Sequence, residues 1–307
     1  MNNFHTPVLL KESINYLVKN PSGFYFDGTL GFGGHSEAIV NKLNSKGILI
    51  ATDVDKDSFT FSKNKFKDDA RIHLYNFNFS LIDTISKIEA LPNFDGILLD
   101  LGVSSFQLDN PSSGFTYRIE SRLDLRMDKN KVISAADIVN SFSEEEIANI
   151  IYKYGEEKNS RNIARSIVNK RRNKKIETTT ELRDAISEVT SEKYLSKTLS
   201  RVFQSLRIYV NDELESLRTF LTKAVDLLKI NGRIVIISYH SLEDRIVKDI
   251  FKYETLDCIC PKDFPVCKCD KERRLKILTK KPVTPSVDEV NINLRSRSAK
   301  LRAVERI

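Results

Sequence analysis

Residues 24–36 read FYFDGTLGFGGHS, and this stretch decides the fold. An aromatic run ends on Asp27, glycines follow at positions 28, 31, 33 and 34, and a helical pattern begins at Ser36. Glycine lets the backbone turn tightly and approach a ligand closely. The order of strand, glycine loop and helix is typical of the first unit of an α/β nucleoside-binding sheet.

A second apolar run supports this interpretation. Residues 47–53 read GILIATD and predict a strand that ends on Asp53. A carboxylate at the tip of the second strand can accept hydrogen bonds from ribose hydroxyls. The two stretches together predict a nucleoside-cofactor site, whereas Asp55 is expected to face solvent or to cap the next helix.

Length and composition set the outer limits. The chain has 307 residues, of which 40% are apolar and 30% charged, which is ample for one α/β domain and a smaller one. There is neither a run of about eighteen apolar residues, as a membrane span needs, nor a signal-peptide pattern, so we expect a cytoplasmic protein with no membrane partner. The net charge of +7 and the pI of about 9.0 suit a polyanionic partner such as nucleic acid, although a generally basic protein gives the same values.

The strand and helix patterns divide the chain into three segments. A helix is predicted at 8–18, and the region from Ala135 to about Leu206 carries apolar stripes at helical spacing. Ser143 with Glu146 and Thr178 with Glu181 have the spacing of capping boxes. Strands are predicted at 24–27, 47–53, 71–76, 94–102, 233–241, 276–281 and 299–306. A long amphipathic helix is predicted at 214–228, and Asn231-Gly232 is expected to end it. We therefore expect an α/β core from residues 1–109 and 213–307, with an all-helical substrate domain inserted at 110–212.

The glycine loop permits two cofactors. A dinucleotide fingerprint needs G-x-G-x-x-G, but Ser36 occupies the third glycine position here. Spacing of the form Asp27-x-x-x-Gly31-x-Gly33 fits S-adenosylmethionine better. The stretch that begins at Asp100 after the fourth strand, DLGVSS, offers a carboxylate and a tight turn beside a methyl donor. These residues favour S-adenosylmethionine over a nicotinamide or flavin dinucleotide.

Eight motifs in order resemble one known family. They are HTPVLL (5–10), DGTLGFGGHS (27–36), DLGVSSFQLD (100–109), LDLRMD (123–128), YGEEK (154–158), FQSLRIYVNDEL (203–214), ISYHSLEDRIVK (237–248) and RSRSAKLRAVER (295–306). The chain closely resembles the bacterial 16S rRNA cytosine-N4 methyltransferases of the MraW/RsmH family. The resemblance implies a Rossmann-like class I S-adenosylmethionine-dependent methyltransferase with an inserted helical substrate domain. It also implies methylation of one cytosine, ribosomal position 1402, in the decoding region of 16S rRNA in the small ribosomal subunit.

The resemblance also implies a set of cofactor contacts. The family's positions fall on Gly33, Gly34, His35, Asp53, Phe79, Asp100 and Gln107. From the residues themselves, we expect Gly33 and Gly34 to make room for the methionine end, Asp53 to bind the ribose and Phe79 to lie against adenine.

Two residues are candidates for the chemistry. The cytosine amine is a poor nucleophile because its lone pair is conjugated with the ring, so the enzyme must hold and orient it. Asp100 is the first candidate acceptor for this amine or for the amino group of the donor. His240 in Ser-Tyr-His-Ser ends the fifth strand and is a second candidate, although a lone histidine is as often structural. No general base is assigned. Phe106, Phe115 or Tyr117 could stack on the flipped base or be packing residues.

Basic residues outside the glycine loop suggest an RNA surface. The densest run is Lys170–Lys175 in the helical insertion, where phosphate contacts are favoured over an ordinary solvated face. Further candidates are Arg118, Arg122, Arg126, Arg295, Arg297, Lys300 and Arg302.

All four cysteines fall within twelve residues, as Cys258-x-Cys260 and Cys267-x-Cys269. Two readings stay open for them, a structural Zn²⁺ site and free thiols in a surface loop. The resemblance implies no metal, so none is assigned to the active site.

Two rival functions remain beside the methyltransferase. An NAD- or FAD-type oxidoreductase would bind a dinucleotide instead of S-adenosylmethionine. A non-catalytic RNA-binding protein would bind RNA without transferring a methyl group.

Overall fold

A single seven-stranded sheet organises the first and last thirds of the chain. The structure, a computed structural model, describes residues 7–103, 114–261 and 266–307. The strands are β1 (Phe24–Asp27), β2 (Ile48–Thr52), β3 (Ile72–Tyr75), β4 (Phe94–Asp100), β5 (Leu228–Ser238), β6 (Leu275–Ile277) and β7 (Lys300–Arg306). Their order is β3-β2-β1-β4-β5-β7-β6, with β1 to β5 parallel and β7 antiparallel to both of its neighbours. The predicted Rossmann-like sheet with a closing pair of strands is thus confirmed.

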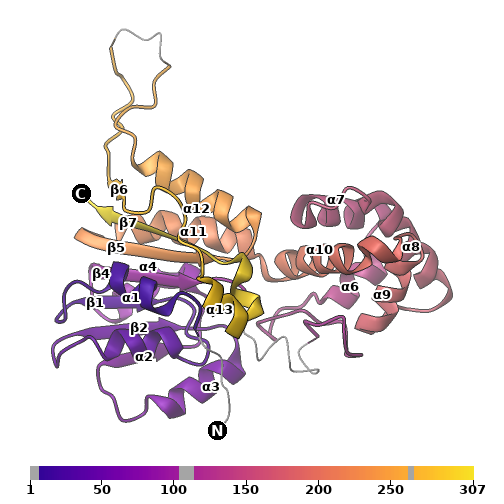
Figure 1. Cartoon of the computed structure of the whole chain (residues 1–307), viewed down its shortest axis with the longest axis horizontal. Coiled ribbons are helices and arrows are strands. Elements are labelled where there is room, and N and C mark those ends of the chain that lie inside the picture. Colours follow the sequence, from indigo (N-terminus) through magenta and orange to yellow (C-terminus); the bar gives the residue numbers. More distant parts are fainter. Residues whose placement is uncertain (1–6, 104–113, 262–265) are drawn as a thin grey trace. The chain divides into compact units, whose positions relative to one another are not determined.

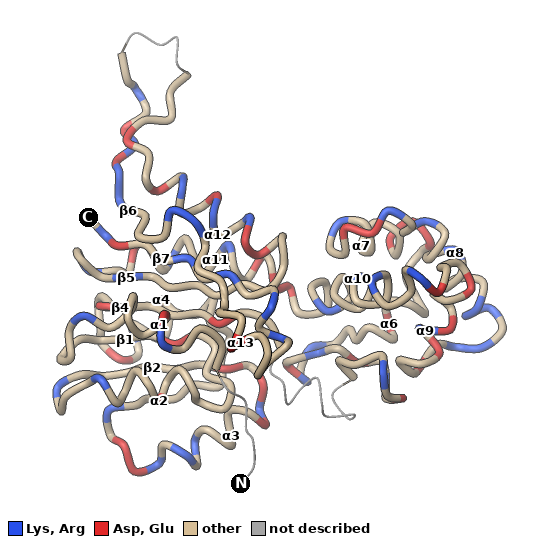
Figure 2. Tube along the Cα trace, in the orientation of Figure 1, with Lys and Arg blue, Asp and Glu red and all other residues tan. Residues whose placement is uncertain are grey.

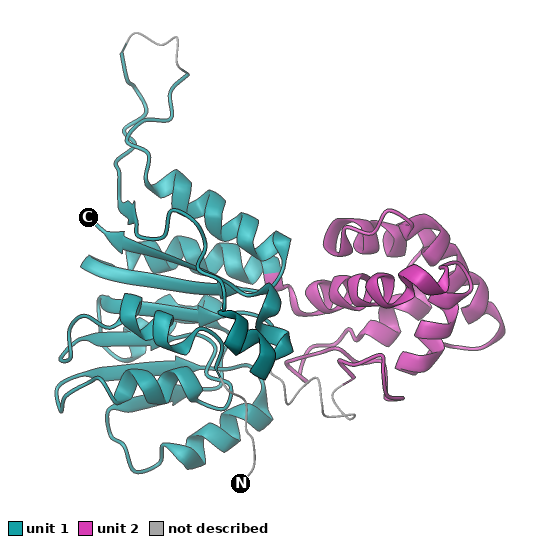
Figure 3. Ribbon diagram, viewed as in Figure 1, with its two compact units in different colours: residues 1–102, 214–307 teal, residues 103–213 magenta. Residues whose placement is uncertain are grey.

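The chain forms two compact units (Figure 3). Unit 1 comprises Met1–Gly102 and Leu214–Ile307, and unit 2 comprises Val103–Glu213, so the second segment begins seven residues before the predicted boundary at 110. Helices of the sheet unit are α1 (Leu10–Leu17), α2 (Gly34–Val40), α3 (Lys56–Lys65), α4 (Ile82–Ile88), α11 (Glu213–Asp226, whose first residue belongs to unit 2), α12 (Ser241–Glu254) and α13 (Val287–Ile292), with short 3₁₀ turns η1 (Phe79–Leu81) and η3 (Leu294–Ser298). No helix of the described residues is long and apolar enough to cross a membrane.

Helices cover both faces of the sheet (Figure 1). Alternating residues of each strand point into the two cores that lie between the sheet and these helices. Phe26, Ile97 and Ile236 face a core that α4, α11 and α12 cover. Their chain neighbours Tyr25 and Leu98 face the opposite core, which α1 and α2 cover. Because both faces are covered, the parallel strands are apolar along most of their length, as the sequence indicated.

Parallel pairing brings the polar strand ends to one edge of the sheet. Asp27 is in register with Ala51 of β2 and with Leu98 of β4, and Asp100 is in register with Ile237 of β5. The residues that follow these strands therefore collect at the carboxyl edge, where ligands of open α/β sheets bind.

The described part of unit 2 consists of helices, an irregular stretch at 114–134 and one isolated β-bridge between Arg122 and Thr178. The helices are α6 (Ala135–Ser141), α7 (Glu144–Gly155), α8 (Ser160–Asn173), α9 (Thr179–Ser187) and α10 (Glu192–Asn211). Their apolar stripes share one buried core. Both predicted capping boxes, at Ser143 and Thr178, are confirmed, and a further one at Ser134 begins α6.

One local prediction was wrong. Asn231-Gly232 was expected to end the long helix, but α11 already ends at Asp226 and the pair lies within β5. The ladder skips there, since Phe94 pairs with Leu228 and Gly96 with Arg233. Asn231 takes φ 63°, which asparagine tolerates better than most residues. Asn231-Gly232 does interrupt the regular backbone of the chain, but it forms a bulge within β5 and not the end of a helix.

A buried aromatic cluster supports the carboxyl edge, and it yields a stability prediction. Phe220 of α11 is fully buried, and its ring lies 6.1 Å from that of Phe26 and 5.4 Å from that of Phe79. Phe220→Ala should lower the free energy of unfolding by roughly 3–5 kcal/mol in urea titrations, because it leaves a cavity that the sheet cannot close. Phe77→Ala makes the same change at a ring that is 42% exposed, and it should cost about 1 kcal/mol or less. Equal losses in the two variants would contradict this assignment of the core.

Candidate active site

Asp27 anchors the glycine loop from the tip of β1. Its side chain is fully buried, and Oδ1 accepts from the Thr29 backbone N–H at 3.0 Å while Oδ2 accepts from the Ser36 hydroxyl at 2.7 Å. Burial raises the pKa of this carboxyl above its usual range. Ser36, which replaces the third glycine of a dinucleotide fingerprint, is thus the residue that ties α2 to β1. The sequence indicated only the missing glycine and not this hydrogen bond.

Three of the four loop glycines, Gly31, Gly33 and Gly34, have different surroundings. Gly31 takes φ +49°, and a Cβ built there meets only the Thr29 carbonyl oxygen at 4.0 Å. A Cβ at Gly33 would lie 2.4 Å from the Phe66 ring, and one at Gly34 would lie 2.3 Å from Pro7. The missing side chains at Gly33 and Gly34 therefore make room for protein atoms, which corrects the expectation that they make room for a ligand. Their cofactor contacts stay a prediction for the backbone.

Asp53 joins the second strand to the loop. Its Oδ2 accepts from the Gly31 N–H at 2.7 Å and its Oδ1 accepts from the Asp55 N–H at 2.9 Å. Each oxygen keeps a second lone pair, so ribose hydroxyls can still donate to this carboxylate. Burial raises the pKa of Asp53 to about 7, partly offset by these two hydrogen bonds. Asp55 caps α3 through the N–H groups of residues 57 and 58, as expected.

Asp100 lies at the tip of the neighbouring strand β4. Its Oδ1 accepts from the Tyr239 hydroxyl at 2.8 Å, and its backbone N–H donates to Thr29 Oγ1 at 2.7 Å. Burial raises the pKa of Asp100 to about 7, which the tyrosine hydroxyl partly counteracts and the nearby charges of Asp27 and Glu243 reinforce. Tyr239 and Thr29 were not predicted as site residues. Their position at successive strand tips was the only signal that could have identified them.

The turn after Asp100 requires glycine. Gly102 has φ +101°, a conformation that residues with a side chain rarely adopt, and a Cβ there would touch the Tyr239 ring at 3.4 Å. The predicted tight turn after β4 is therefore confirmed at this residue. It carries the chain out of the sheet beside the carboxylate of Asp100.

His35 connects the loop to the segment before α1. Its Nε2 donates to the Val8 carbonyl oxygen at 3.2 Å, and its Nδ1 lies 3.6 Å from Asp100 Oδ2. The ring is only 6% exposed. His35 thus holds the Pro7–Val8 segment against the loop and turns its other nitrogen toward Asp100.

Two predicted cofactor residues remain, Phe79 and Gln107, and the structure describes only Phe79. Phe79 begins η1 directly after β3, is partly buried, and packs edge-on against Phe220. It also lies under the glycine loop, since a Cβ at Gly28 would come within 2.7 Å of it. Gln107 lies outside the described residues, as does Phe106.

His240 has a clear structural function at the start of α12. Its Nδ1 accepts from the Glu243 N–H at 3.4 Å, and Glu243 Oε2 accepts in return from the backbone N–H groups of Tyr239 and His240. A histidine here acts as the N-cap of a capping box, a role that Ser, Thr, Asp or Asn usually fills. Its catalytic role stays a prediction, and the cap is sufficient to explain why the residue is buried.

The carboxyl edge of the sheet is strongly acidic for a buried region. Asp27, Asp53 and Asp100 follow three adjacent strands, and the charge of Asp27 raises the pKa of both other carboxyls. Within the described residues, no lysine or arginine forms an ion pair with any of the three, and His35 is the basic side chain that faces Asp100. Such an edge favours a cationic ligand and disfavours a pyrophosphate.

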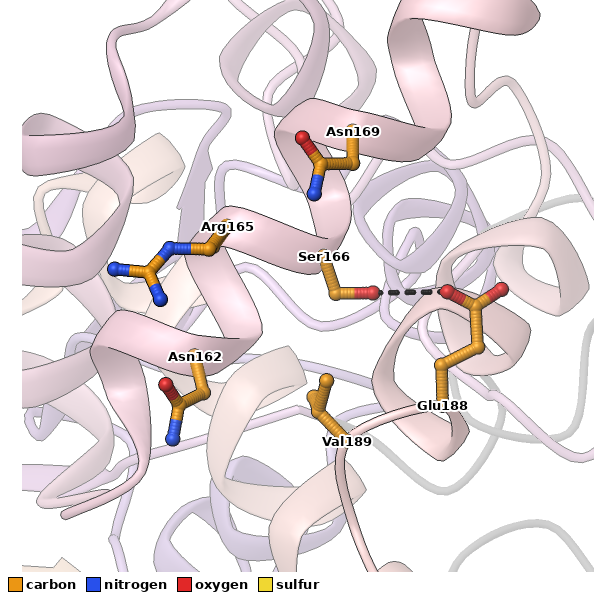
Figure 4. A pocket seen from close by; sticks show the side chains of 6 residues that line it. All are labelled: Asn162, Arg165, Ser166, Asn169, Glu188 and Val189. Carbon is orange, nitrogen blue, oxygen red and sulfur yellow. Dashed lines mark hydrogen bonds between the residues drawn. The ribbon is translucent and has the colours of Figure 1, made fainter.

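Unit 2 contains a polar surface pocket of its own. It has a volume of about 430 Å³ and is lined by side chains of α8 and of the end of α9, namely Asn162, Arg165, Ser166, Asn169, Glu188 and Val189 (Figure 4). Ser166 donates to Glu188 at 3.1 Å across it. The pocket has no glycine turn and no carboxylate pair, so we assign no cofactor to it.

The basic run 170–175 is only partly available to a ligand. Arg171 donates to the Val139 carbonyl oxygen, Lys170 pairs with Glu188, and Lys174 pairs with Glu181. Arg172 and Lys175 are exposed and are not paired with a carboxylate among the described residues. Figure 2 shows the basic positions at the end of α8 and in the loop before α9.

Several other basic side chains that were predicted to contact RNA form ion pairs with carboxylates of the protein. Arg126 binds Asp124 through two nitrogens, and Arg302 and Lys300 both bind Asp244. Arg118, Arg122, Arg295 and Arg297 are exposed. Phe115 is buried in the core of unit 2, and Tyr117 packs against Phe203 there, so the packing alternative is confirmed for both.

Comparisons with known proteins show the family to which the chain belongs. Residues 2–307 match the model of the MraW methylase family. Ribosomal RNA small subunit methyltransferase H of Caldicellulosiruptor saccharolyticus is 50% identical over 304 residues, covering 99% of each chain. The protein of the same name from Fusobacterium nucleatum is 46% identical, covering all of this chain and 98% of its own.

The acidic edge leads to a pH prediction for ligand binding. A cationic ligand stabilises the ionised forms of Asp53 and Asp100, whose pKa values are about 7 in the free protein. Its binding must therefore release protons near neutrality, and S-adenosylmethionine affinity should rise by about tenfold for each carboxylate between about pH 6 and pH 8. Calorimetry in two buffers of different ionisation enthalpy measures the proton count. An affinity that falls with rising pH would mean that the edge prefers an anion.

Proposed function

The chain belongs to the MraW methylase family, and from that premise we propose that it methylates the N4 amine of one cytosine, ribosomal position 1402, in 16S rRNA. It is an S-adenosylmethionine-dependent methyltransferase. The observation that carries the proposal is the group of three carboxylates at the carboxyl edge of the sheet, beside a glycine turn that is open at Gly31.

The residues at this edge fit the cofactor. S-adenosylmethionine carries a sulfonium and an ammonium group, so its cationic end suits an edge where Asp27, Asp53 and Asp100 lie near one another without lysine or arginine partners among the described residues. A dinucleotide would bring a pyrophosphate to the same place and would be repelled. Ser36 also occupies the position where a dinucleotide fingerprint needs its third glycine. Both observations disfavour the oxidoreductase.

Each cofactor contact has a residue suited to it. Asp53 would accept from the ribose hydroxyls, and Phe79 would flank the adenine. The backbone from Gly31 to Gly34 and the side chain of His35 would lie along the methionine part. Gln107 completes the set that the family resemblance implies. When bound, the cofactor supplies an electrophilic methyl group.

The chain's own contribution to the reaction centres on Asp100. The Tyr239 hydroxyl holds its carboxylate, and the Thr29 side-chain hydroxyl holds its backbone N–H. The carboxylate would accept a hydrogen bond from the N4 amine. Such an acceptor localises the nitrogen lone pair and aligns it with the methyl group. The same carboxylate would also be placed to accept the proton that the amine loses. His240 would keep Tyr239 in place by capping α12, and it would act as a positioning residue.

The substrate is large and anionic, and unit 2 is the part of the chain suited to recognise it. Exposed basic side chains lie at the end of α8 and in the loop that follows it, where Arg172 and Lys175 are the clearest examples (Figure 2). We propose that residues 110–212 act as the substrate-recognition domain and that the substrate is 16S rRNA within the small ribosomal subunit. A ribosomal substrate places the enzyme in the cytoplasm.

Transfer of a labelled methyl group tests the proposed substrate. Purified protein is incubated with methyl-labelled S-adenosylmethionine and either small subunits or free 16S rRNA lacking the modification. Label in one cytosine, recovered as N4-methylcytidine after nuclease digestion, is the expected result. Label in another nucleoside would overturn the proposed specificity, and binding of RNA without label would favour the non-catalytic RNA-binding protein.

Asp100→Asn tests the proposed acceptor. The amide keeps the size of the side chain but loses its charge, so the rate of methyl transfer at saturating substrate should fall roughly 10²- to 10³-fold. Asp55→Asn is the matched control at the same edge, because asparagine caps α3 about as well as aspartate. Weaker cofactor binding with an unchanged rate would show that Asp100 holds the donor and not the amine.

Arg172 and Lys175 provide the test of the RNA surface. The double change to glutamine should weaken binding of 16S rRNA and lower the slope of affinity against salt concentration by about one to two. Lys42 and Lys46 are exposed at the opposite edge of the sheet, before β2, and their double change to glutamine is the control. Fluorescence anisotropy over a salt series measures both. If the two double variants bind alike, unit 2 does not contact RNA through this run.

A further inference from the structure

The four cysteines come together in the segment between α12 and β6. Their sulfurs all lie within 4.8 Å of one another. Cys258 and Cys269 are 3.9 Å apart, Cys260 and Cys267 are 3.9 Å apart, and Cys267 and Cys269 are 3.4 Å apart. The described parts of this segment, residues 255–261 and 266–274, extend away from the sheet (Figure 1). Since the chain has no other cysteine, every thiol of the protein is in this cluster.

Backbone N–H groups point at the sulfurs in a reciprocal pattern. The N–H of Ile259, between the first two cysteines, donates to Cys269 Sγ at 3.3 Å. The N–H of Lys268, between the last two, donates to Cys260 Sγ at 3.4 Å. The residue between the two cysteines of each pair therefore donates to the second sulfur of the other pair. The N–H of Cys260 also donates to Cys258 Sγ. Donors arranged in this way stabilise thiolates.

Among the described residues of the segment, 255–261 and 266–274, no side chain is buried, so they form no core that could hold this geometry. Ile259 and Val266 are 47% and 66% exposed, so they contribute little buried apolar area. Its base is well fixed, because Arg274 binds the buried carboxylate of Glu254 through two nitrogens and the Arg274 N–H donates to the Glu254 carbonyl. We call residues 255–261 and 266–274 the two arms of the segment. Beyond that base, the thiols are the described groups that can hold the two arms together. Small units without a sufficient core commonly rely on a metal or on disulfides.

We propose that Cys258, Cys260, Cys267 and Cys269 bind one structural Zn²⁺ ion as four thiolates. A Zn–S bond of about 2.3 Å in a tetrahedron requires sulfurs about 3.8 Å apart, and the three separations above lie close to that value. Each thiol loses its proton to solvent as its Zn–S bond forms, and the ion, with no open position, has no part in methyl transfer. The net charge of the centre is −2, which the backbone donors offset. The ion cross-links the two arms of this segment, which belongs to unit 1.

The metal content of the full chain tests this proposal directly. Protein purified under reducing conditions should contain one zinc per chain by mass spectrometry of metals. A thiol-specific mercurial should release it, as detected with a chromogenic chelator. Replacement by Co²⁺ should give the intense visible bands of tetrahedral cobalt together with thiolate charge-transfer bands. Zinc should also slow trypsin cleavage after Lys268 and Lys271.

Variants separate a metal site from a chance cluster. Cys267→Ser with Cys269→Ser should lose the zinc and its trypsin protection, whereas Val266→Ser, an equally exposed change next to the same pair, should keep both. If the cysteine variant does not fold, the cobalt spectrum of the unaltered chain still decides. Reduced protein that binds neither zinc nor cobalt would overturn the proposal, as would iron in place of zinc or a pair of disulfides.

Discussion

The buried carboxylate of Asp27 is the constraint on which the rest of the site depends. A charged group without solvent must have its oxygens satisfied, and here the Thr29 N–H and the Ser36 hydroxyl satisfy them. Those two bonds fix both ends of the glycine loop. Thr29 in turn accepts from the backbone of Asp100, so the tip of β1 positions the tip of β4. One side chain thereby sets the geometry of the first turn and of its neighbour.

The same carboxylate shapes the electrostatics of the edge. Burial raises the pKa of Asp53 and of Asp100, and the charge of Asp27 adds to both shifts. The basic group that faces Asp100 is the ring of His35. An edge of this kind is costly without a ligand and becomes favourable when a cation binds. The glycine loop, which is shared by many nucleotide-binding sheets, does not select the cofactor by itself. We propose that the acidic residues around the loop select the cofactor, because they suit the cationic methyl donor of a methyltransferase.

Much of this arrangement could be predicted from the sequence, for identifiable reasons. Strand periodicity and the capping boxes at Ser143 and Thr178 are local patterns, and they gave the sheet, the helical insertion and the N-cap role of Asp55. The bond from Ser36 to Asp27 and that from Tyr239 to Asp100 join residues nine and 139 positions apart. Such contacts depend on strand order and on rotamers, which no local pattern specifies. The same limit explains why Gly33 and Gly34 were expected to face a ligand, when Phe66 and Pro7 fill those positions.

We propose that the acidic edge binds a cationic methyl donor and that its methyl group is transferred to a single cytosine in 16S rRNA. Mass spectrometry of 16S rRNA from cells that lack the gene, with and without the restored chain, tests it most directly. The account predicts that N4 methylation of the decoding-region cytosine is lost without the gene and returns with the unaltered chain but not with Asp100→Asn. Unchanged methylation of that cytosine in cells without the gene would contradict it.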